Sequence, residues 1–241
     1  MDPNHLTELI ATEQRYWWHV AKRELVIDLL CRHFPPPASL VEAGIGAAGN
    51  LAAFRAIGYD VSGLDILPDS TAHGRTLGVA ELHVHDIEHP WPMAPRSADV
   101  VVMLDVLEHL REPAMALQHA ARVLTPNGGI LLTVPAGPWL TSSWDDMLGH
   151  QRRYTAAMLR AHAAEAGFRL VWHSHWNSFS LPAAAVLRLS ERWFRRREST
   201  AFPRVPAIVS DVLLRCARAE RAVIRRTSMP CGLSLVGVLS R

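Results

Sequence analysis

The chain has 241 residues, of which 49% are hydrophobic and 20% charged, with a formal net charge of +2. This composition provides for a sizeable core and excludes a disordered chain, and the length suits one domain. No apolar run is as long as a membrane span, the start lacks the features of a signal peptide, and the three cysteines show no disulfide or metal-binding spacing, so we expect a cytoplasmic protein.

Apolar spacing and turn residues predict alternating helices and strands along the first two thirds of the chain. Helices between successive strands indicate a parallel sheet that is covered on both faces. The predicted elements are helix 5–33, strand 39–42, a helix ending at Ile57, strand 60–64, helix 68–77, strands 81–84 and 99–104, a helix from Pro113 to Leu124 that Asn127-Gly128-Gly129 terminates, and strand 130–134.

The last third of the chain has a different pattern. It predicts helix 155–167, strand 168–173, amphipathic helices at 183–197 and 206–226, and a last strand at 234–240. Between Pro182 and Arg226 there are eleven arginines and four acids, so the positive charge is concentrated in this segment. We expect either a solvated helix surface or weak contact with an anionic acceptor, a carrier protein or a membrane.

Three glycines stand where the first strand meets the following helix. Gly44, Gly46 and Gly49 have the spacing G-x-G-x-x-G, and Asp65 follows at the distance of a ribose-binding acid. This pattern occurs in nicotinamide oxidoreductases and in S-adenosylmethionine methyltransferases. Taken alone, it does not decide between the two classes.

The charges around the glycine loop favour the second class. A dinucleotide places a pyrophosphate on this loop, and an acid beside it would repel that group. S-adenosylmethionine carries an ammonium and a sulfonium instead, and both favour nearby acids. Glu42 precedes the loop, and Asp65, Asp86 and Asp105 each follow a predicted strand, at the edge where such sheets bind ligands.

Several segments resemble class I S-adenosylmethionine-dependent methyltransferases, in particular a bacterial small-molecule branch similar to the ubiquinone-biosynthesis O-methyltransferases. The loop departs from the common pattern at Ala47-Ala48, where Thr or Ser is frequent. The matching segments are Val41 to Gly46, Asp65, His85-Asp86-Ile87, Leu104 to Leu110, Gly149 to Tyr154, Ala166-Gly167-Phe168, Tyr16-Trp17-Trp18 with Arg23, and Gly232 to Leu235.

The resemblance covers about residues 14–241 and implies an α/β fold. That fold is a Rossmann-like, doubly wound sheet of seven strands with the last strand antiparallel, an N-terminal helix and a helical insertion before the last strand. We expect a single domain, with a helical cap at 1–37, a cofactor-binding core at 38–173, an insertion on the acceptor side at 174–231 and the last strand at 232–241.

The resemblance also implies the cofactor S-adenosyl-L-methionine, with S-adenosyl-L-homocysteine as product. Glu42 would organise the methionine amine, Asp65 the ribose hydroxyls and Asp86 the adenine amino group. Arg23 would bind the methionine carboxylate. The expected cofactor-binding set is Glu42, Gly44, Gly46, Gly49, Asp65, Ile66, Asp86, Ile87, Leu104, Asp105 and Arg23.

Two histidines are placed to act on an acceptor. His109 follows the fourth strand and His150 lies beyond the fifth. We expect methyl transfer to a hydroxyl of a small molecule that belongs to natural-product, sugar or lipid biosynthesis. We expect His150 to act as a metal-free general base and His109 to shape the pocket. The residues expected to contact the acceptor are Trp139, Trp144, Arg153 and Tyr154.

Three alternatives stay open at this point. Asp105, Glu108, His109 and His150 together offer two oxygens and two nitrogens to a divalent cation, although we expect no metal. A nicotinamide oxidoreductase would use the same glycine loop. A non-catalytic S-adenosylmethionine-binding protein would keep the same cofactor contacts. We expect no nucleic-acid partner, and either a monomer or a homodimer.

Overall fold

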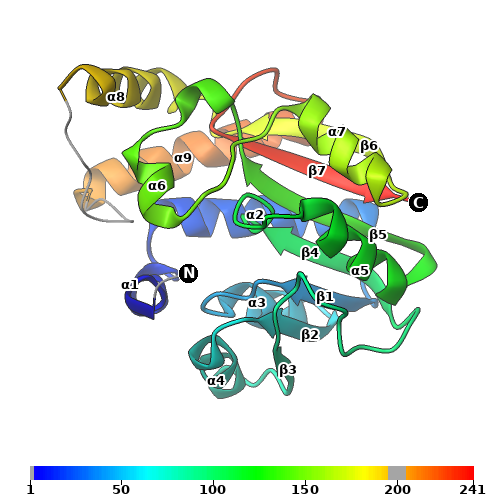
Figure 1. The fold of residues 1–241 in the computed structure, drawn as a ribbon. Coiled ribbons are helices and arrows are strands. Elements are labelled where there is room, and N and C mark those ends of the chain that lie inside the picture. Colours follow the sequence, from blue (N-terminus) through cyan, green and yellow to red (C-terminus); the bar gives the residue numbers. More distant parts are fainter. Residues whose placement is uncertain (1–2, 195–204) are drawn as a thin grey trace.

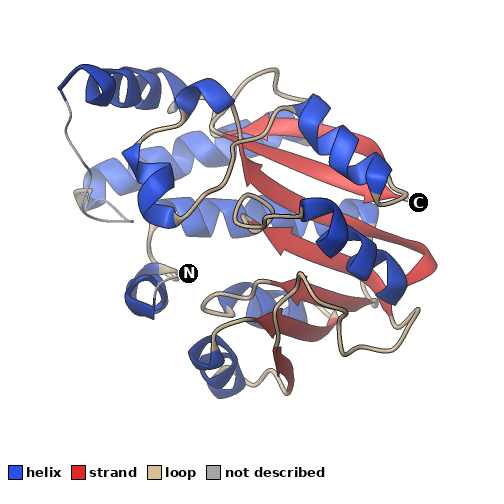
Figure 2. Cartoon of the chain, in the orientation of Figure 1, coloured by secondary structure: helices blue, strands red, loops and turns tan. Residues whose placement is uncertain are grey.

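The computed structural model describes residues 3–194 and 205–241, whose strands form a seven-stranded sheet (Figures 1 and 2). The strand order is β3-β2-β1-β4-β5-β7-β6, and β7 is antiparallel to both of its neighbours. This confirms the predicted Rossmann-like sheet with an antiparallel last strand. The strands are β1 (Ser39–Ala43), β2 (Asp60–Asp65), β3 (Glu81–Val84), β4 (Ala98–Leu104), β5 (Leu124–Pro135), β6 (Arg169–Trp176) and β7 (Ser234–Ser240).

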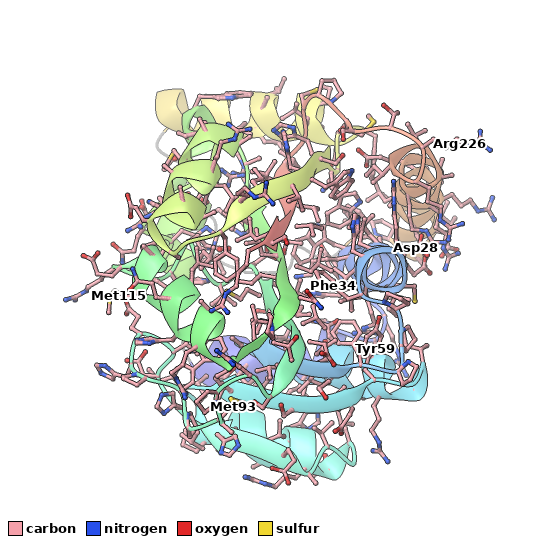
Figure 3. The ribbon with its side chains drawn as sticks, turned by 90° about the vertical axis from the view of Figure 1, so that its right-hand side faces the viewer. Asp28, Phe34, Tyr59, Met93, Met115 and Arg226 are labelled. Carbon is pink, nitrogen blue, oxygen red and sulfur yellow. The ribbon has the colours of Figure 1, made fainter. Side chains whose placement is uncertain are left out.

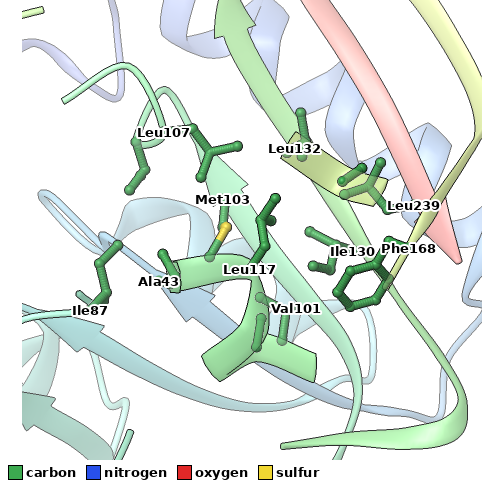
Figure 4. Packing of buried hydrophobic residues seen from close by; sticks show 14 of the residues in the cluster. Ala43, Ile87, Val101, Met103, Leu107, Leu117, Ile130, Leu132, Phe168 and Leu239 are labelled. Carbon is green, nitrogen blue, oxygen red and sulfur yellow. The ribbon is translucent and has the colours of Figure 1, made fainter. Parts of the chain in front are cut away.

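Helices cover both faces of the sheet, as the alternation predicts. On one face, Leu117 of α5 lies among buried residues of the strands (Figure 4), and Leu159 of α7 belongs to the same buried cluster. On the other face α2, α3 and α9 form a second buried cluster. The helices are α1 (Pro3–Thr12), α2 (Trp17–His33), α3 (Gly49–Ala56), α4 (Pro68–Thr76), α5 (Pro113–Val123), α6 (Ser143–Leu148), α7 (Ala156–Glu165), α8 (Leu181–Phe194) and α9 (Ala207–Ile224), with a 3-10 turn at Pro138–Leu140.

The predicted helix 5–33 is wrong in one respect, because a turn after Thr12 divides it into α1 and α2. Arg15 N and Tyr16 N both donate to Thr12 O, which closes that turn. The turn leaves Glu13 buried, with its Oε1 atom 3.1 Å from Arg23 Nη2. The apolar residues have helical spacing across this turn, but the contact between Glu13 and Arg23 favours the break in the helix.

Other boundaries also differ from the prediction. Helix α5 ends at Val123, and Asn127-Gly128-Gly129 lies within β5, between the pairs that Leu124 and Gly129 form with Ala98 and Val100 of β4. Helix α6 was not predicted, since its six residues are too few to show a period. It is stabilised by a capping box between Ser142 and Asp145. Residues 195–197 of the predicted helix 183–197, with their three arginines, lie outside the described residues.

Part of the positive charge of the insertion is used inside the molecule. Arg218 and Arg221 on α9 pair with Glu24 on α2, and Arg225 pairs with Asp28. In Figure 3, Asp28 lies beside the end of α9 that Arg226 marks. Within the described residues no helix is both long and apolar enough to cross a membrane.

The strand order determines where a ligand site can form. Strand β1 lies between β2 and β4, so the chain leaves β1 toward one side of the sheet and β4 toward the other. Ligands of such sheets bind at this point, beyond the carboxyl ends of the strands. Gly44 follows β1 there, and Asp105 follows β4.

Candidate active site

A cavity of about 720 Å³ lies beyond the carboxyl ends of β1, β2 and β4. Its wall includes most of the predicted cofactor-binding residues, whereas Gly49 and Arg23 do not line it. The predicted residues in the wall are Glu42, Gly44, Gly46, Asp65, Ile66, Asp86, Ile87, Leu104 and Asp105.

The glycine loop approaches its neighbours too closely for larger residues. Gly44 has a φ of +82°, and a Cβ there would lie 2.6 Å from Cγ2 of Val106. Gly46 also has a positive φ, and its N–H donates to Asp65 Oδ2 at 3.0 Å. A Cβ at Gly49 would collide with the carboxylate of Glu13, so Gly49 serves packing in this structure.

Asp65 is held in place by backbone donors. Its second oxygen, Oδ1, accepts from Leu67 N at 2.9 Å. Burial raises the pKa of Asp65, and these backbone hydrogen bonds from Leu67 and Gly46 work against that rise. The carboxylate therefore has a fixed orientation at the cavity wall before any ligand binds.

Glu42 is buried near the end of β1, just before the glycine loop, with an incomplete set of partners. Its Oε1 accepts from Asn50 Nδ2 at 3.3 Å, and its Oε2 has no hydrogen-bond partner among the described residues. Burial raises the pKa of Glu42 to about 8. An ammonium group in the cavity would supply both the missing donor and the missing charge.

Asp105 is neutralised from within the protein. Lys22 Nζ donates to Asp105 Oδ2 at 2.8 Å, and Thr133 Oγ1 donates to Oδ1 at 2.9 Å. Burial alone would raise the pKa of Asp105, but the charge and hydrogen bond of Lys22, the hydrogen bond from Thr133 and the nearby His150 together lower it. From the sequence, Asp105 is one of four acids expected to face a cationic ligand. In the structure its charge is already matched by Lys22, so Glu42, Asp65 and Asp86 remain.

Lys22 and Asp145 line the cavity but were not among the site residues predicted from the sequence. Lys22 is the only lysine of the chain, and its Nζ lies 4.1 Å from the ring centroid of Trp18. Its neighbour Arg23, which we expected to face the cofactor, instead donates to Asn50 Oδ1 at 3.1 Å and pairs with Glu13. The one sequence feature that could have pointed to Lys22 is that the chain has no other lysine.

The far half of the cavity brings the two predicted histidines together. The rings of His109 and His150 have centroids 4.8 Å apart. His150 Nδ1 lies 2.9 Å from Asp145 Oδ1, which also accepts from Arg153 Nη1 at 2.8 Å. Burial opposes ionisation of Asp145, but the hydrogen bond with His150 and the charge of Arg153 lower its pKa to about 2.

Glu108 lies beside these histidines and is fully buried. Its Oε1 is 4.0 Å from His150 Nε2, and neither of its carboxyl oxygens has a hydrogen-bond partner in the described part of the chain. Burial raises the pKa of Glu108 well above its usual value. Burial also lowers the pKa of His109 to about 4, with a smaller contribution from His150.

The four residues predicted to contact the acceptor lie in different surroundings in the structure. Trp144 and Arg153 line the cavity. Trp139 does not, because it lies in the 3-10 turn with 52% of its surface exposed. Tyr154 is fully buried, and its hydroxyl donates to Leu107 O at 3.3 Å. Residue type alone could not separate these aromatics, since exposure depends on how the loop after β5 folds.

Comparison with known proteins identifies the family. A family model described as a methyltransferase domain matches residues 16–173. The chain belongs to this methyltransferase family. A relative in Mycolicibacterium smegmatis, named "Probable S-adenosylmethionine-dependent methyltransferase", is 30% identical over 164 residues. That match covers 66% of this chain and 61% of the relative, so the chain spans less than two thirds of the relative's length.

Solved structures share the fold at low sequence identity. An S-adenosylmethionine-dependent methyltransferase from Mesorhizobium loti has a TM-score of 0.61 at 14% identity, covering 92% of this chain and 98% of that one. The [4+2]-cyclase SpnF has a TM-score of 0.61 at 16% identity, covering 94% and 84%. The fold is therefore compatible with more than one reaction, and the chemistry must be argued from the site.

The ion pair between Lys22 and Asp105 gives a first prediction. Lys22→Met should lower the free energy of unfolding by about 3 kcal/mol, because it leaves the carboxylate of Asp105 without its cation. The double variant Lys22→Met/Asp105→Asn should regain much of that loss, since no charge remains uncompensated. Urea unfolding measures both, with Arg160→Met on the exposed surface of α7 as a control that changes stability by less than about 0.5 kcal/mol. A double variant no more stable than the single one would contradict this account.

Proposed function

We propose that the protein transfers a methyl group from S-adenosyl-L-methionine to a hydroxyl of a small molecule. The observation that carries the cofactor assignment is the pair of buried carboxylates, Glu42 and Asp65, on either side of the glycine loop. A pyrophosphate would be repelled by the carboxylate of Asp65 and would further oppose ionisation of Glu42. The ammonium of S-adenosylmethionine favours the ionised form of Glu42 instead, and its ribose hydroxyls can donate to Asp65. The family match supports the same class and favours no oxidoreductase.

Each contact of the cofactor follows from one structural feature. The unpartnered Oε2 of Glu42 would accept from the methionine ammonium. Asp65, already oriented by the N–H groups of Gly46 and Leu67, would accept from both ribose hydroxyls. Asp86, which is half-exposed at the cavity wall beyond β3, would accept from the adenine amino group. The contact between Arg23 and the methionine carboxylate of the cofactor stays a prediction.

The reaction itself needs alignment more than activation. The sulfonium is already a good leaving group, so holding the acceptor oxygen in line with the methyl carbon and the sulfur supplies up to about 7–11 kcal/mol. Trp17, Trp18 and Trp144 line the cavity and would give an acceptor an apolar wall. His150, oriented by Asp145, is the group placed to activate a hydroxyl, either as a free base or as a metal ligand.

The remaining expectations belong to the same proposal. The kinship to ubiquinone-type O-methyltransferases, the small-molecule acceptor and a cytoplasmic location are consistent with the family. The cavity is lined by side chains from several helices and loops around one edge of the sheet, and we propose a small acceptor rather than a nucleic acid for it. Arg188 of the insertion reaches the cavity wall, where its Nη1 atom donates to Leu140 O.

A second prediction concerns Asp65. Asp65→Ala should weaken binding of S-adenosyl-L-homocysteine by about 10- to 150-fold, the loss of about 1.5–3 kcal/mol expected for hydrogen bonds to a charged acceptor. Asp60→Ala, at the exposed start of the same strand, is the matched control and should bind normally. Calorimetry on both variants and the wild type, with NADP as competing ligand, gives the answer. Tight NADP binding without any S-adenosyl-L-homocysteine binding would refute the proposed function.

A third prediction follows from the raised pKa of Glu42. Below pH 8 the carboxyl of the free protein holds a proton. An ammonium bound at Glu42 requires the charged form, so binding of S-adenosyl-L-homocysteine at pH 6.5 should release about one proton, and affinity should rise as pH increases toward 8. Calorimetry in buffers of different ionisation enthalpy measures this release.

Two variants make the third prediction specific. Glu42→Gln cannot ionise and should release no proton. Glu81→Gln, at the exposed start of β3, should behave like the wild type. Equal proton release by the wild type and by Glu42→Gln would show that Glu42 does not meet the cofactor ammonium.

A further inference from the structure

Three side chains in the acceptor half of the cavity present metal-ligating atoms to one another. One ligand atom each from Glu108, His109 and His150 can be chosen so that all three lie within 4.8 Å of one another. Three atoms that bind one cation at about 2.1 Å with tetrahedral angles lie about 3.4 Å from one another. The widest separation would therefore have to close by about 1.4 Å, which requires rotation of these side chains when the cation binds.

Both histidines are already oriented as metal ligands are. His150 Nδ1 lies 2.9 Å from the carboxylate oxygen Oδ1 of Asp145, and His109 Nδ1 lies 3.3 Å from the backbone oxygen of Gly149. Each contact fixes the ring and leaves Nε2 as the atom available to a cation. Carboxylate and carbonyl acceptors behind a ligating imidazole are the usual arrangement around protein-bound metals.

Glu108 supplies an independent observation. It is a fully buried carboxyl group, and neither oxygen has a hydrogen-bond partner in the parts of the chain that are described. Such a group costs free energy unless a ligand satisfies it. Asp105, which we grouped with these residues from the sequence, is excluded because Lys22 and Thr133 already occupy its oxygens.

We propose that Glu108, His109 and His150 bind a divalent transition-metal cation whose remaining coordination positions face the acceptor. Two imidazole nitrogens and one carboxylate suit Zn²⁺, Fe²⁺, Co²⁺ or Mn²⁺ better than Mg²⁺ or Ca²⁺, which prefer oxygen ligands alone. His150 then acts as a ligand rather than as the metal-free base that the sequence analysis expected.

A role for this cation in activating the acceptor rests on the proposed methyl transfer. Binding of the cation to the three side chains does not depend on that proposal. An acceptor hydroxyl bound to the cation becomes more acidic and loses its proton to solvent water. The oxygen then forms a bond to the methyl carbon as the carbon–sulfur bond breaks. The electron pair of that bond stays on sulfur, which becomes the neutral thioether of S-adenosyl-L-homocysteine.

Titration with Co²⁺ tests the site directly. Tag-free protein is dialysed against EDTA and then against metal-free buffer, and Co²⁺ is added while the visible absorption bands of coordinated Co²⁺ are recorded. We expect one strongly bound Co²⁺ per chain in the wild type. Glu108→Gln and His109→Ala should each weaken binding at least tenfold, and His73→Ala on α4, away from the cavity, should not change it.

Glu108→Gln is the more informative variant, because it replaces a buried carboxyl with a side chain of the same shape and should fold normally. Absence of coordinated Co²⁺ in the wild type, or equal Co²⁺ affinity in all variants, would overturn the proposal. Calorimetry with S-adenosyl-L-homocysteine on the same metal-free sample tests the proposed function separately. The metal site can therefore fail while cofactor binding persists, and the reverse also holds.

Discussion

Buried carboxylates at one edge of the sheet are the constraint on which the rest of this structure depends. Taking an ionised carboxylate out of water is costly unless a cation or several donors replace the lost solvent. Lys22 does this for Asp105, and Arg153 does it for Asp145, while backbone N–H groups serve Asp65. Glu42 and Glu108 retain oxygens without a partner among the described residues, and these two mark where we place the cofactor ammonium and a divalent cation.

The same constraint explains why elements far apart in the sequence enclose the cavity. Helix α2 carries Lys22 to the end of β4, and α6 carries Asp145 to His150 and Arg153. The division of the N-terminal helix at Thr12 lets Glu13 turn inward toward Arg23 and the loop at Gly49. Each of these contacts joins charged side chains of different elements, so the site is complete only when those elements are packed together.

Much of this arrangement was predictable from the sequence. The glycine spacing and the acids that follow the strands predicted the loop, the sheet edge and most of the cavity wall, because they depend on local periods and on the parallel topology. The pairing of Lys22 with Asp105, the short helix α6 and the burial of Tyr154 were not predictable. They depend on contacts between distant segments, which leave no periodic signal. The sequence alone does not distinguish Glu42, Asp65, Asp86 and Asp105. In the structure, Asp105 is paired with Lys22, whereas one oxygen of Glu42 has no partner among the described residues.

The central claim is that this sheet edge binds a cation-bearing nucleoside without phosphates. Native mass spectrometry of the freshly purified protein, under conditions that retain bound ligands, tests it most directly. The account predicts a population whose added mass equals that of S-adenosyl-L-methionine or S-adenosyl-L-homocysteine, and added S-adenosyl-L-homocysteine should convert the ligand-free protein to that mass. A population carrying NAD or NADP, with no adduct of S-adenosyl-L-homocysteine even at excess, would contradict it.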